Sequence, residues 1–153
     1  MTDYTLLNKQ LEALVAGQKN VTGMLANAAA LLHQTTGWFW VGFYMVCGDE
    51  LQLGPFQGPV ACYRIGFGRG VCGAAWQRQE SIVVPDVEEF PGHIACSSLS
   101  RSEIVVPIFH RSQVRGVLDI DSTEKGTFTE ADREGLEEFC AILSAAIFGA
   151  EEQ

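Results

Sequence analysis

Hydrophobic periodicity divides the chain into helical ends and a strand-rich middle. Over residues 1–36 apolar side chains recur at helical spacing, with a break at residues 17–20 (Gly-Gln-Lys-Asn). Near the other end, Thr129 followed three residues later by Asp132 is typical of a capping box, so a helix should begin there. Its apolar stripe comprises Leu136, Phe139, Cys140, Leu143, Ala146 and Ile147.

Short apolar runs bounded by turn residues predict strands between these helices. Residues 38–46 are aromatic and apolar enough for a central strand, and residues 48–50 turn into a second strand at 51–53. The runs at 104–109 and 114–121 predict another hairpin, which turns at residues 110–113. Shorter strands are expected at 62–65 and 81–84.

The order of elements indicates an α+β fold. Hairpins join most of the strands, so the sheet should be antiparallel, with the terminal helices packed on one face. Residues 85–100 form a long irregular segment, and such segments in compact domains are usually functional.

Length and charge limit the classes of function. The chain has 153 residues, 47% of them apolar, which fits one globular domain. Its formal net charge of -9 argues against sequence-independent binding to nucleic acid or to anionic membranes. The sequence shows no signal-peptide pattern and no apolar run long enough to span a membrane, so a cytoplasmic protein is expected.

A glycine-rich segment, residues 68–73, formally matches the dinucleotide-binding pattern GxGxxG. That pattern requires a βαβ unit and an acidic residue about 20 positions further on. The hairpins contradict a parallel crossover and Asp86 comes too early. A glycine-rich turn with unusual backbone angles is the favoured interpretation.

Five cysteines raise the question of redox chemistry. Cys47 and Cys140 are interpreted as small hydrophobic residues that end a strand and line a helix. The other three, Cys62, Cys72 and Cys96, could be buried structural thiols or a redox pair, although Cys96 lies in a loop rich in Pro, Gly and Ser. Together with His93 they could also bind a metal ion, but no CxxC spacing supports this reading, and no metal is expected.

Two carboxylates project from one face of the last strand, because Asp119 and Asp121 are two residues apart. Like charges this close repel each other unless water or a cation lies between them, so a bound ammonium group is one interpretation and solvated positions are the other. Glu103 begins the partner strand, but its face depends on whether the hairpin contains a bulge. Trp40 and Tyr44 share a strand face, as core residues or as an aromatic wall.

Several motifs in one order, from residue 38 to the end of the last helix, closely resemble the free methionine-(R)-sulfoxide reductases. They are ACYRIGFGRGVCGAAW, VPDVEEFPGHIAC, RSEIVVPI and GVLDIDS. The resemblance implies a single GAF-like catalytic domain over residues 1–153, with a loop-rich ligand pocket on the sheet face opposite the helices.

The resemblance also implies roles for the candidate residues. Cys96 would be the catalytic thiol, Cys62 the resolving thiol and Cys72 a secondary thiol. The substrate-binding residues would be Glu103, Asp119, Asp121, Trp40 and Tyr44. One departure is Ser97, where the family pattern has Asp.

The implied reaction reduces free methionine sulfoxide through a sulfenic acid and a disulfide, with no cofactor. Thioredoxin or a similar dithiol would restore the thiols. A non-catalytic GAF sensor of small ligands and a thiol-based redox sensor remain alternatives. The apolar faces of the terminal helices also make a homodimer conceivable.

Overall fold

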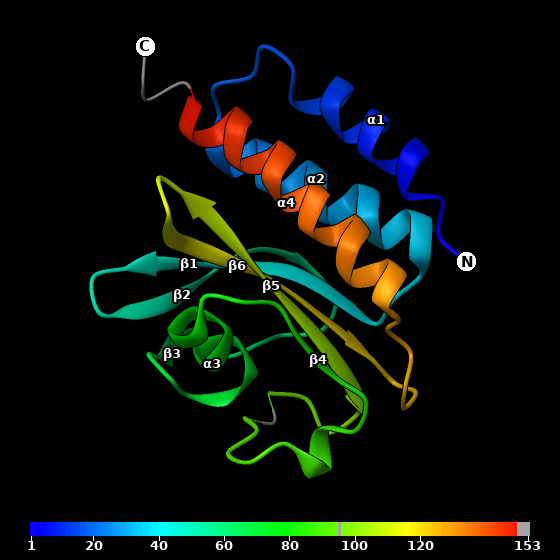
Figure 1. Ribbon diagram of the computed structural model, residues 1–153, viewed down its shortest axis with the longest axis vertical. Helices are drawn as coiled ribbons and strands as arrows, with labels where there is room; N and C mark the ends of the chain where they lie inside the picture. Colours follow the sequence, from blue (N-terminus) through cyan, green and yellow to red (C-terminus); the bar gives the residue numbers. More distant parts are fainter. Residues whose placement is uncertain (95, 150–153) are drawn as a thin grey trace.

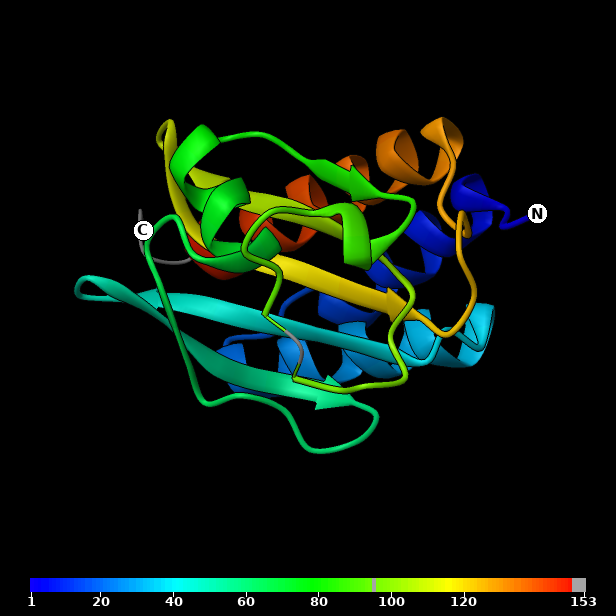
Figure 2. The ribbon, with the colours of Figure 1, turned by 90° about the horizontal axis from the view of Figure 1, so that it is seen from below.

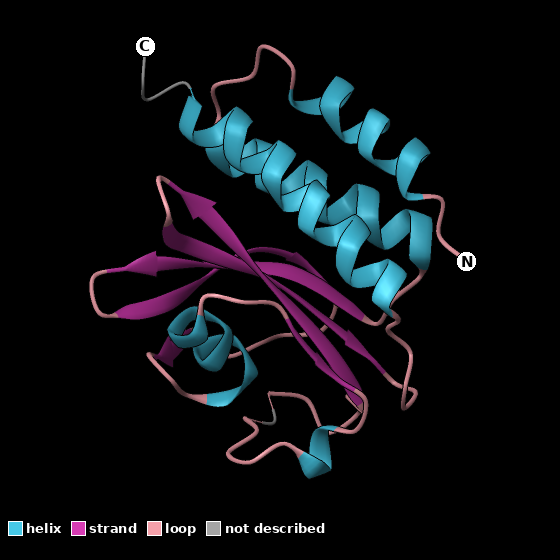
Figure 3. Cartoon of the chain, in the orientation of Figure 1, coloured by secondary structure: helices cyan, strands magenta, loops and turns pink. Residues whose placement is uncertain are grey.

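Six antiparallel strands form a curved sheet in the computed structural model, which describes residues 1–94 and 96–149 (Figures 1 and 3). They are β1 (Trp40–Cys47), β2 (Glu50–Gln57), β3 (Arg64–Gly66), β4 (Ile82–Val84), β5 (Ser102–His110) and β6 (Gln113–Ser122). Their order across the sheet is β3-β2-β1-β6-β5-β4, with every neighbouring pair antiparallel. The prediction of an antiparallel α+β fold is therefore confirmed.

Helices cover one face of this sheet in two tiers. The helices α2 (Val21–Thr36) and α4 (Glu130–Gly149) pack on the strands, and α1 (Tyr4–Val15) packs on these two helices (Figure 1). The opposite face carries α3 (Gly70–Arg78), the short helix η1 (Val87–Glu89) and the long connecting loops (Figure 2). The loop-bearing face is therefore the one free to form a pocket.

The helix ends follow from local side-chain chemistry. Asn20 caps α2 by accepting a hydrogen bond from the Gly23 N–H at 3.1 Å, which explains the predicted break before it. The predicted capping box is present at α4, because the Thr129 N–H donates to Asp132 and the Asp132 N–H donates to Thr129 Oγ1.

Alternation along the strands sorts the buried residues into two cores. On β6, Leu118 and Ile120 point into a core shared with the helices, whereas Val117 belongs to a second core beneath α3. The first core is built almost entirely from aliphatic and aromatic side chains. The polar residues predicted for the site fall on the second face.

Three local predictions need correction. β3 begins at Arg64, so Cys62 precedes the strand that was expected to contain it, because only three residues pair with β2. β2 is longer than expected and ends at Gln57. Cys47 ends β1 as predicted, but its side chain is exposed rather than packed, since it lies beside the turn into β2.

Candidate active site

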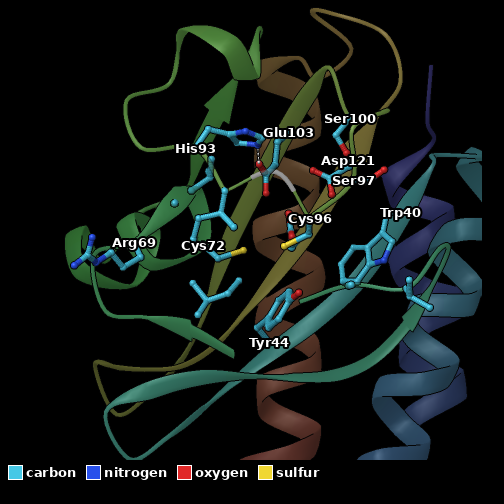
Figure 4. A pocket seen from close by; sticks show the side chains of 17 residues that line it. Trp40, Tyr44, Arg69, Cys72, His93, Cys96, Ser97, Ser100, Glu103 and Asp121 are labelled. Carbon is cyan, nitrogen blue, oxygen red and sulfur yellow. Dashed lines mark ion pairs between the residues drawn. The ribbon is translucent and has the colours of Figure 1, made fainter. Parts of the chain in front are cut away.

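A cavity of about 40 Å³ lies on the loop-bearing face of the sheet, between β1, β6, β5, α3 and the loop that follows η1 (Figure 4). It brings together seven of the eight predicted site residues: Trp40, Tyr44, Cys72, Cys96, Glu103, Asp119 and Asp121. The eighth, Cys62, is bonded to Cys96.

Three carboxyl groups lie on the floor of this cavity. Asp119 and Asp121 project from β6 on the same face, as their spacing predicted. Asp121 pairs with Trp40 on one side and with Glu103 on the other, while Asp119 pairs with Gly42 and Val105. The sheet therefore places acidic groups from two strands side by side.

A β-bulge puts Glu103 on the pocket face. Ile108 pairs with Gly116 but Phe109 pairs with Val114, so Arg115 is an extra residue on β6. Without this shift Glu103 would oppose Ile120 and point toward the helices. The structure thus resolves the question that the sequence left open.

Two of the three candidate thiols form a disulfide. Cys62 and Cys96 are bonded, with their Cα atoms 5.6 Å apart. The bond joins the segment between β2 and β3 to the loop between η1 and β5, and these segments lie side by side over the sheet in Figure 2. Cys96 therefore lines the same cavity as the three carboxyl groups.

Aromatic side chains form the wall at the β1 end. Trp40 stacks on Tyr44 with ring centroids 6.0 Å apart, and on Phe56 at 5.1 Å. Residue 42, between Trp40 and Tyr44 on β1, is a glycine, because a Cβ at this position would come within 2.4 Å of the Cβ of Phe56. The Tyr44 hydroxyl donates to the Cys62 carbonyl at 2.9 Å, so this wall also positions a disulfide cysteine.

Known proteins of the same fold are about half identical to this chain over most of its length. The GAF domain family matches residues 20–147. The free methionine-R-sulfoxide reductase of Escherichia coli is 48% identical over 94% of this chain and 88% of its own length. GAF domain-containing protein A of Dictyostelium discoideum is 51% identical over 92% of this chain and 89% of its own. The crystal structure of the Neisseria meningitidis free methionine-R-sulfoxide reductase with its substrate has a TM-score of 0.95 at 50% identity, covering 97% of this chain and 90% of that one.

This chain belongs to the free methionine-R-sulfoxide reductase family of GAF-domain proteins. The resemblance carried by the sequence motifs is therefore confirmed, and so is the GAF-type fold.

Burial and mutual repulsion dominate the electrostatics of this reductase-family pocket. Burial, and then the charge of Asp121, raise the pKa of Glu103 to about 8. Burial, and then neighbouring carboxylates, raise the pKa values of Asp119 and Asp121 as well. Asp119 Oδ1 is buried with no hydrogen-bond partner among the described residues. The three carboxyl groups can therefore retain protons at neutral pH, and a bound cationic group would favour their ionised forms.

His93 contributes a ring nitrogen rather than a fixed charge. Its Nε2 lies 3.5 Å from Glu103 Oε1 (Figure 4). Burial lowers the pKa of His93, against the opposing effect of Asp119, so the imidazole is neutral at pH 7. His93, considered from the sequence as a metal ligand, therefore lies beside Glu103 in the cavity wall.

Cys72 remains a free thiol at the start of α3, buried in the cavity wall. Burial, and then Asp119 and Glu103, raise the pKa of its thiol well above the ordinary value. Ligand atoms of these three residues lie within 4.8 Å of one another, so they could surround a small cation. The four-ligand set considered from the sequence does not form, because Cys62 and Cys96 are joined to each other.

The glycine-rich segment before α3 is a turn, as favoured from the sequence. Gly68 and Gly70 have positive φ angles of 74° and 59°.

Ser97, the departure from the family pattern, accepts a hydrogen bond from the Leu99 N–H at 3.3 Å. A serine oxygen thus fulfils an acceptor role here that a carboxylate could also provide.

Several cavity-lining residues were not predicted from the sequence, among them Ser100 and Ile94. Ser100 is buried in the cavity wall, and Ile94 covers Gly70 at its rim. Both belong to the irregular segment predicted to be functional, but no periodicity marked them individually.

Among the helices in the described residues, none has the length and apolarity needed to cross a membrane.

Proposed function

We propose that this protein reduces free L-methionine-(R)-S-oxide to L-methionine, with Cys96 as the nucleophile and Cys62 as the resolving thiol. The observation that carries the proposal is the Cys62–Cys96 disulfide beside a buried acidic cavity. The disulfide is the expected product of the reaction, and the cavity is the expected site of the substrate. The named reductases among the relatives support the same activity.

Substrate recognition follows from the charges in the cavity. Asp119 and Asp121 would hold the α-ammonium group, and Asp119 Oδ1 offers an unused acceptor for it. Trp40 and Tyr44 would pack against the methyl–sulfur end. A methionine sulfoxide inside a peptide lacks the ammonium group, which explains a preference for the free amino acid.

The chemical step combines thiolate attack with proton donation. The Cys96 thiolate attacks the sulfoxide sulfur and forms an S–S bond while the sulfoxide oxygen takes up a proton. The hydroxyl group then moves to Cys96 Sγ as the S–O and S–S bonds break, which releases methionine and leaves Cys96 as a sulfenic acid. Glu103, with a pKa of about 8, is largely protonated at pH 7 and is the proposed donor to the sulfoxide oxygen. The Cys62 thiol then attacks the sulfenic sulfur, forming the disulfide and releasing water.

The resting protein is recovered by two-electron reduction. Thioredoxin or a similar dithiol would reduce the disulfide, with Cys72 as an auxiliary thiol and no cofactor. We further propose that residues 1–153 act as one catalytic domain in the cytoplasm. Homodimer formation through the helical face stays a prediction, to be checked by the mass of the protein in solution.

The disulfide occupies the sulfur of Cys96, so the oxidised protein has no free nucleophile at this position. We accordingly expect free methionine sulfoxide to be converted by the reduced protein and not by the oxidised one.

The direct test is methionine formation from free methionine-(R)-sulfoxide with dithiothreitol as reductant. The N-acetylated amide of the same sulfoxide is the matched control, because it lacks the ammonium group. We expect turnover of the free amino acid and little turnover of the blocked one. Equal turnover of both would refute the recognition model.

The thiol redox sensor remains a second candidate, because the Cys62–Cys96 disulfide alone would also fit it. In that case peroxide would form the disulfide, and methionine sulfoxide would not.

A further inference from the structure

Several exposed apolar side chains lie close in sequence to the cysteines of the Cys62–Cys96 disulfide. Ten large apolar residues are exposed among the described residues, and five of them lie within five positions of a disulfide cysteine. Four flank the bond closely, and we call them the disulfide rim: Val60 and Tyr63 beside Cys62, and Ile94 and Leu99 beside Cys96. Val60 and Tyr63 are 88% and 80% exposed, which is unusual for residues in ordered segments.

The rim also has a charge opposite to that of the whole chain. Residues 58–69 and 91–102 contain three arginines and no aspartate or glutamate, although the net charge of the protein is -9. Arg64, Arg69 and Arg101 are all exposed. Arg64 is paired with Glu50, and Arg101 is close enough to Asp86 to help lower the pKa of that carboxyl, whereas Arg69 lines the cavity near Val60 and Ile94. An acidic partner is thus repelled less by this surface than by the rest of the protein.

The disulfide itself restricts what the partner can be. In the cycle proposed above, a dithiol must bring one sulfur into bonding distance of the disulfide. A protein dithiol can do so only by covering the residues next to the bond, which are the rim. An apolar centre with a charged periphery is the usual composition of such an interface.

We propose that the disulfide rim is the docking surface for an acidic dithiol oxidoreductase, which attacks Cys62 rather than Cys96. This inference rests on the proposed function only in requiring a disulfide that is reduced from outside. Cys96 lines the cavity and Cys62 does not, and the two most exposed rim residues, Tyr63 and Val60, flank Cys62, with Val60 also at the cavity wall. Docking on Val60 and Tyr63 therefore brings the attacking sulfur to Cys62.

The exchange balances in two steps. The partner's thiolate bonds to Cys62 Sγ, the Cys62–Cys96 bond breaks, and Cys96 leaves as a thiolate. The partner's second thiol then gives up its proton and bonds to the first sulfur, releasing Cys62. Two electrons pass from the dithiol to this protein, and the first bond broken restores the proposed nucleophile directly.

The test measures reduction of the preformed disulfide without any sulfoxide, so that it does not depend on the proposed activity. The reductants are reduced thioredoxin and dithiothreitol, and the variants are Tyr63→Ser and Leu99→Ser. Leu6→Ser is the matched control, because Leu6 is 53% exposed on α1 and Leu99 is 59% exposed in the rim. We expect kcat/KM for thioredoxin to fall roughly tenfold in each rim variant, with the control unchanged.

Dithiothreitol separates docking from damage to the loops. Its rate should be the same in all variants, Tyr63→Phe should restore thioredoxin reactivity, and added salt should slow thioredoxin alone. Unchanged thioredoxin kinetics in both rim variants would overturn the proposal, as would equal losses with both reductants. A rim that instead binds a second copy of the chain would show self-association lost in Tyr63→Ser and normal thioredoxin kinetics, which also overturns it.

The attacked sulfur is identified separately. A thioredoxin whose second active-site cysteine is replaced by serine traps the mixed disulfide. Peptide mapping should place this bond at Cys62. A bond mainly at Cys96 would overturn the assignment of the attacked sulfur.

Discussion

The two faces of strand β6 are made from alternating residues of one short sequence, yet they serve opposite purposes. Leu118 and Ile120 are fully buried against the helices, in a core of apolar side chains. Asp119, on the other face, is 6% exposed, and its buried Oδ1 has no hydrogen-bond partner in the part of the chain that the structure describes. The helix face gains free energy from burial, whereas the pocket face buries carboxyl groups at a cost. The comparison indicates that apolar burial on the helical side offsets the cost of burying carboxyl groups on the pocket side.

Replacing the proposed nucleophile on the pocket side should cause the largest loss of turnover. Cys96→Ser is expected to lower sulfoxide turnover by at least about a thousandfold, because serine is a far weaker nucleophile. Cys140→Ser, on the helix face, is the control, and it should change turnover much less. Steady-state assays with dithiothreitol measure both. Full activity in Cys96→Ser would mean that another residue attacks the sulfoxide.

The helix face should respond in stability rather than in chemistry. Leu118→Ala removes a fully buried side chain and should lower the free energy of unfolding by about 2–5 kcal/mol. Turnover per folded molecule should change little at a temperature where the variant remains folded. Urea denaturation and an activity assay on the same sample test this. A large drop in turnover without a loss of stability would contradict the division between the faces.

Glu103→Gln should have the opposite effect to Leu118→Ala, because it should lower turnover without lowering stability. Loss of the acid is expected to reduce turnover about a hundredfold. The raised pKa of Glu103 means that the folded state holds a proton that the unfolded state releases, so its burial lowers stability progressively as pH rises from 4.5 through about 8. The neutral amide avoids this cost, so the variant should melt a few degrees higher at pH 8 than the wild type. A lower melting temperature at that pH would contradict the assigned protonation.

The pH profile gives the smallest expected effect. With a pKa of about 8, the protonated fraction of Glu103 falls roughly tenfold between pH 7 and pH 9. Single-turnover reduction of sulfoxide by pre-reduced protein should show an alkaline limb of this size. The limb should be absent in Glu103→Gln. An identical limb in that variant would assign the acid to another group.

Sequence alone predicted those parts of the molecule that depend on local periodicity. Helix positions, the capping box at Thr129, and the common face of Asp119 and Asp121 all follow from spacing. The face of Glu103 could not be predicted, since it depends on one extra residue at Arg115 that no pattern marks. The position of the turn after β5 was predicted, but its backbone conformation was not, because Arg111 and Ser112 both have positive φ and such residues rarely adopt these angles.

The placement of the thiols also lay beyond periodicity. Cys62 and Cys96 are separated by 34 residues, and tertiary packing brings their segments together. The family motifs, rather than spacing, suggested that pairing. The hydrogen bond from Tyr44 to the Cys62 carbonyl had no counterpart in the sequence pattern, because an aromatic strand residue is equally typical of a core.

The most direct test of the central claim is mass spectrometry of the reduced protein after one equivalent of free methionine-(R)-sulfoxide. The account predicts one methionine released per protein and a loss of two hydrogens, mapped by peptide analysis to a bond between Cys62 and Cys96. Consumption of the sulfoxide with the Cys96 thiol still free to alkylate would contradict it.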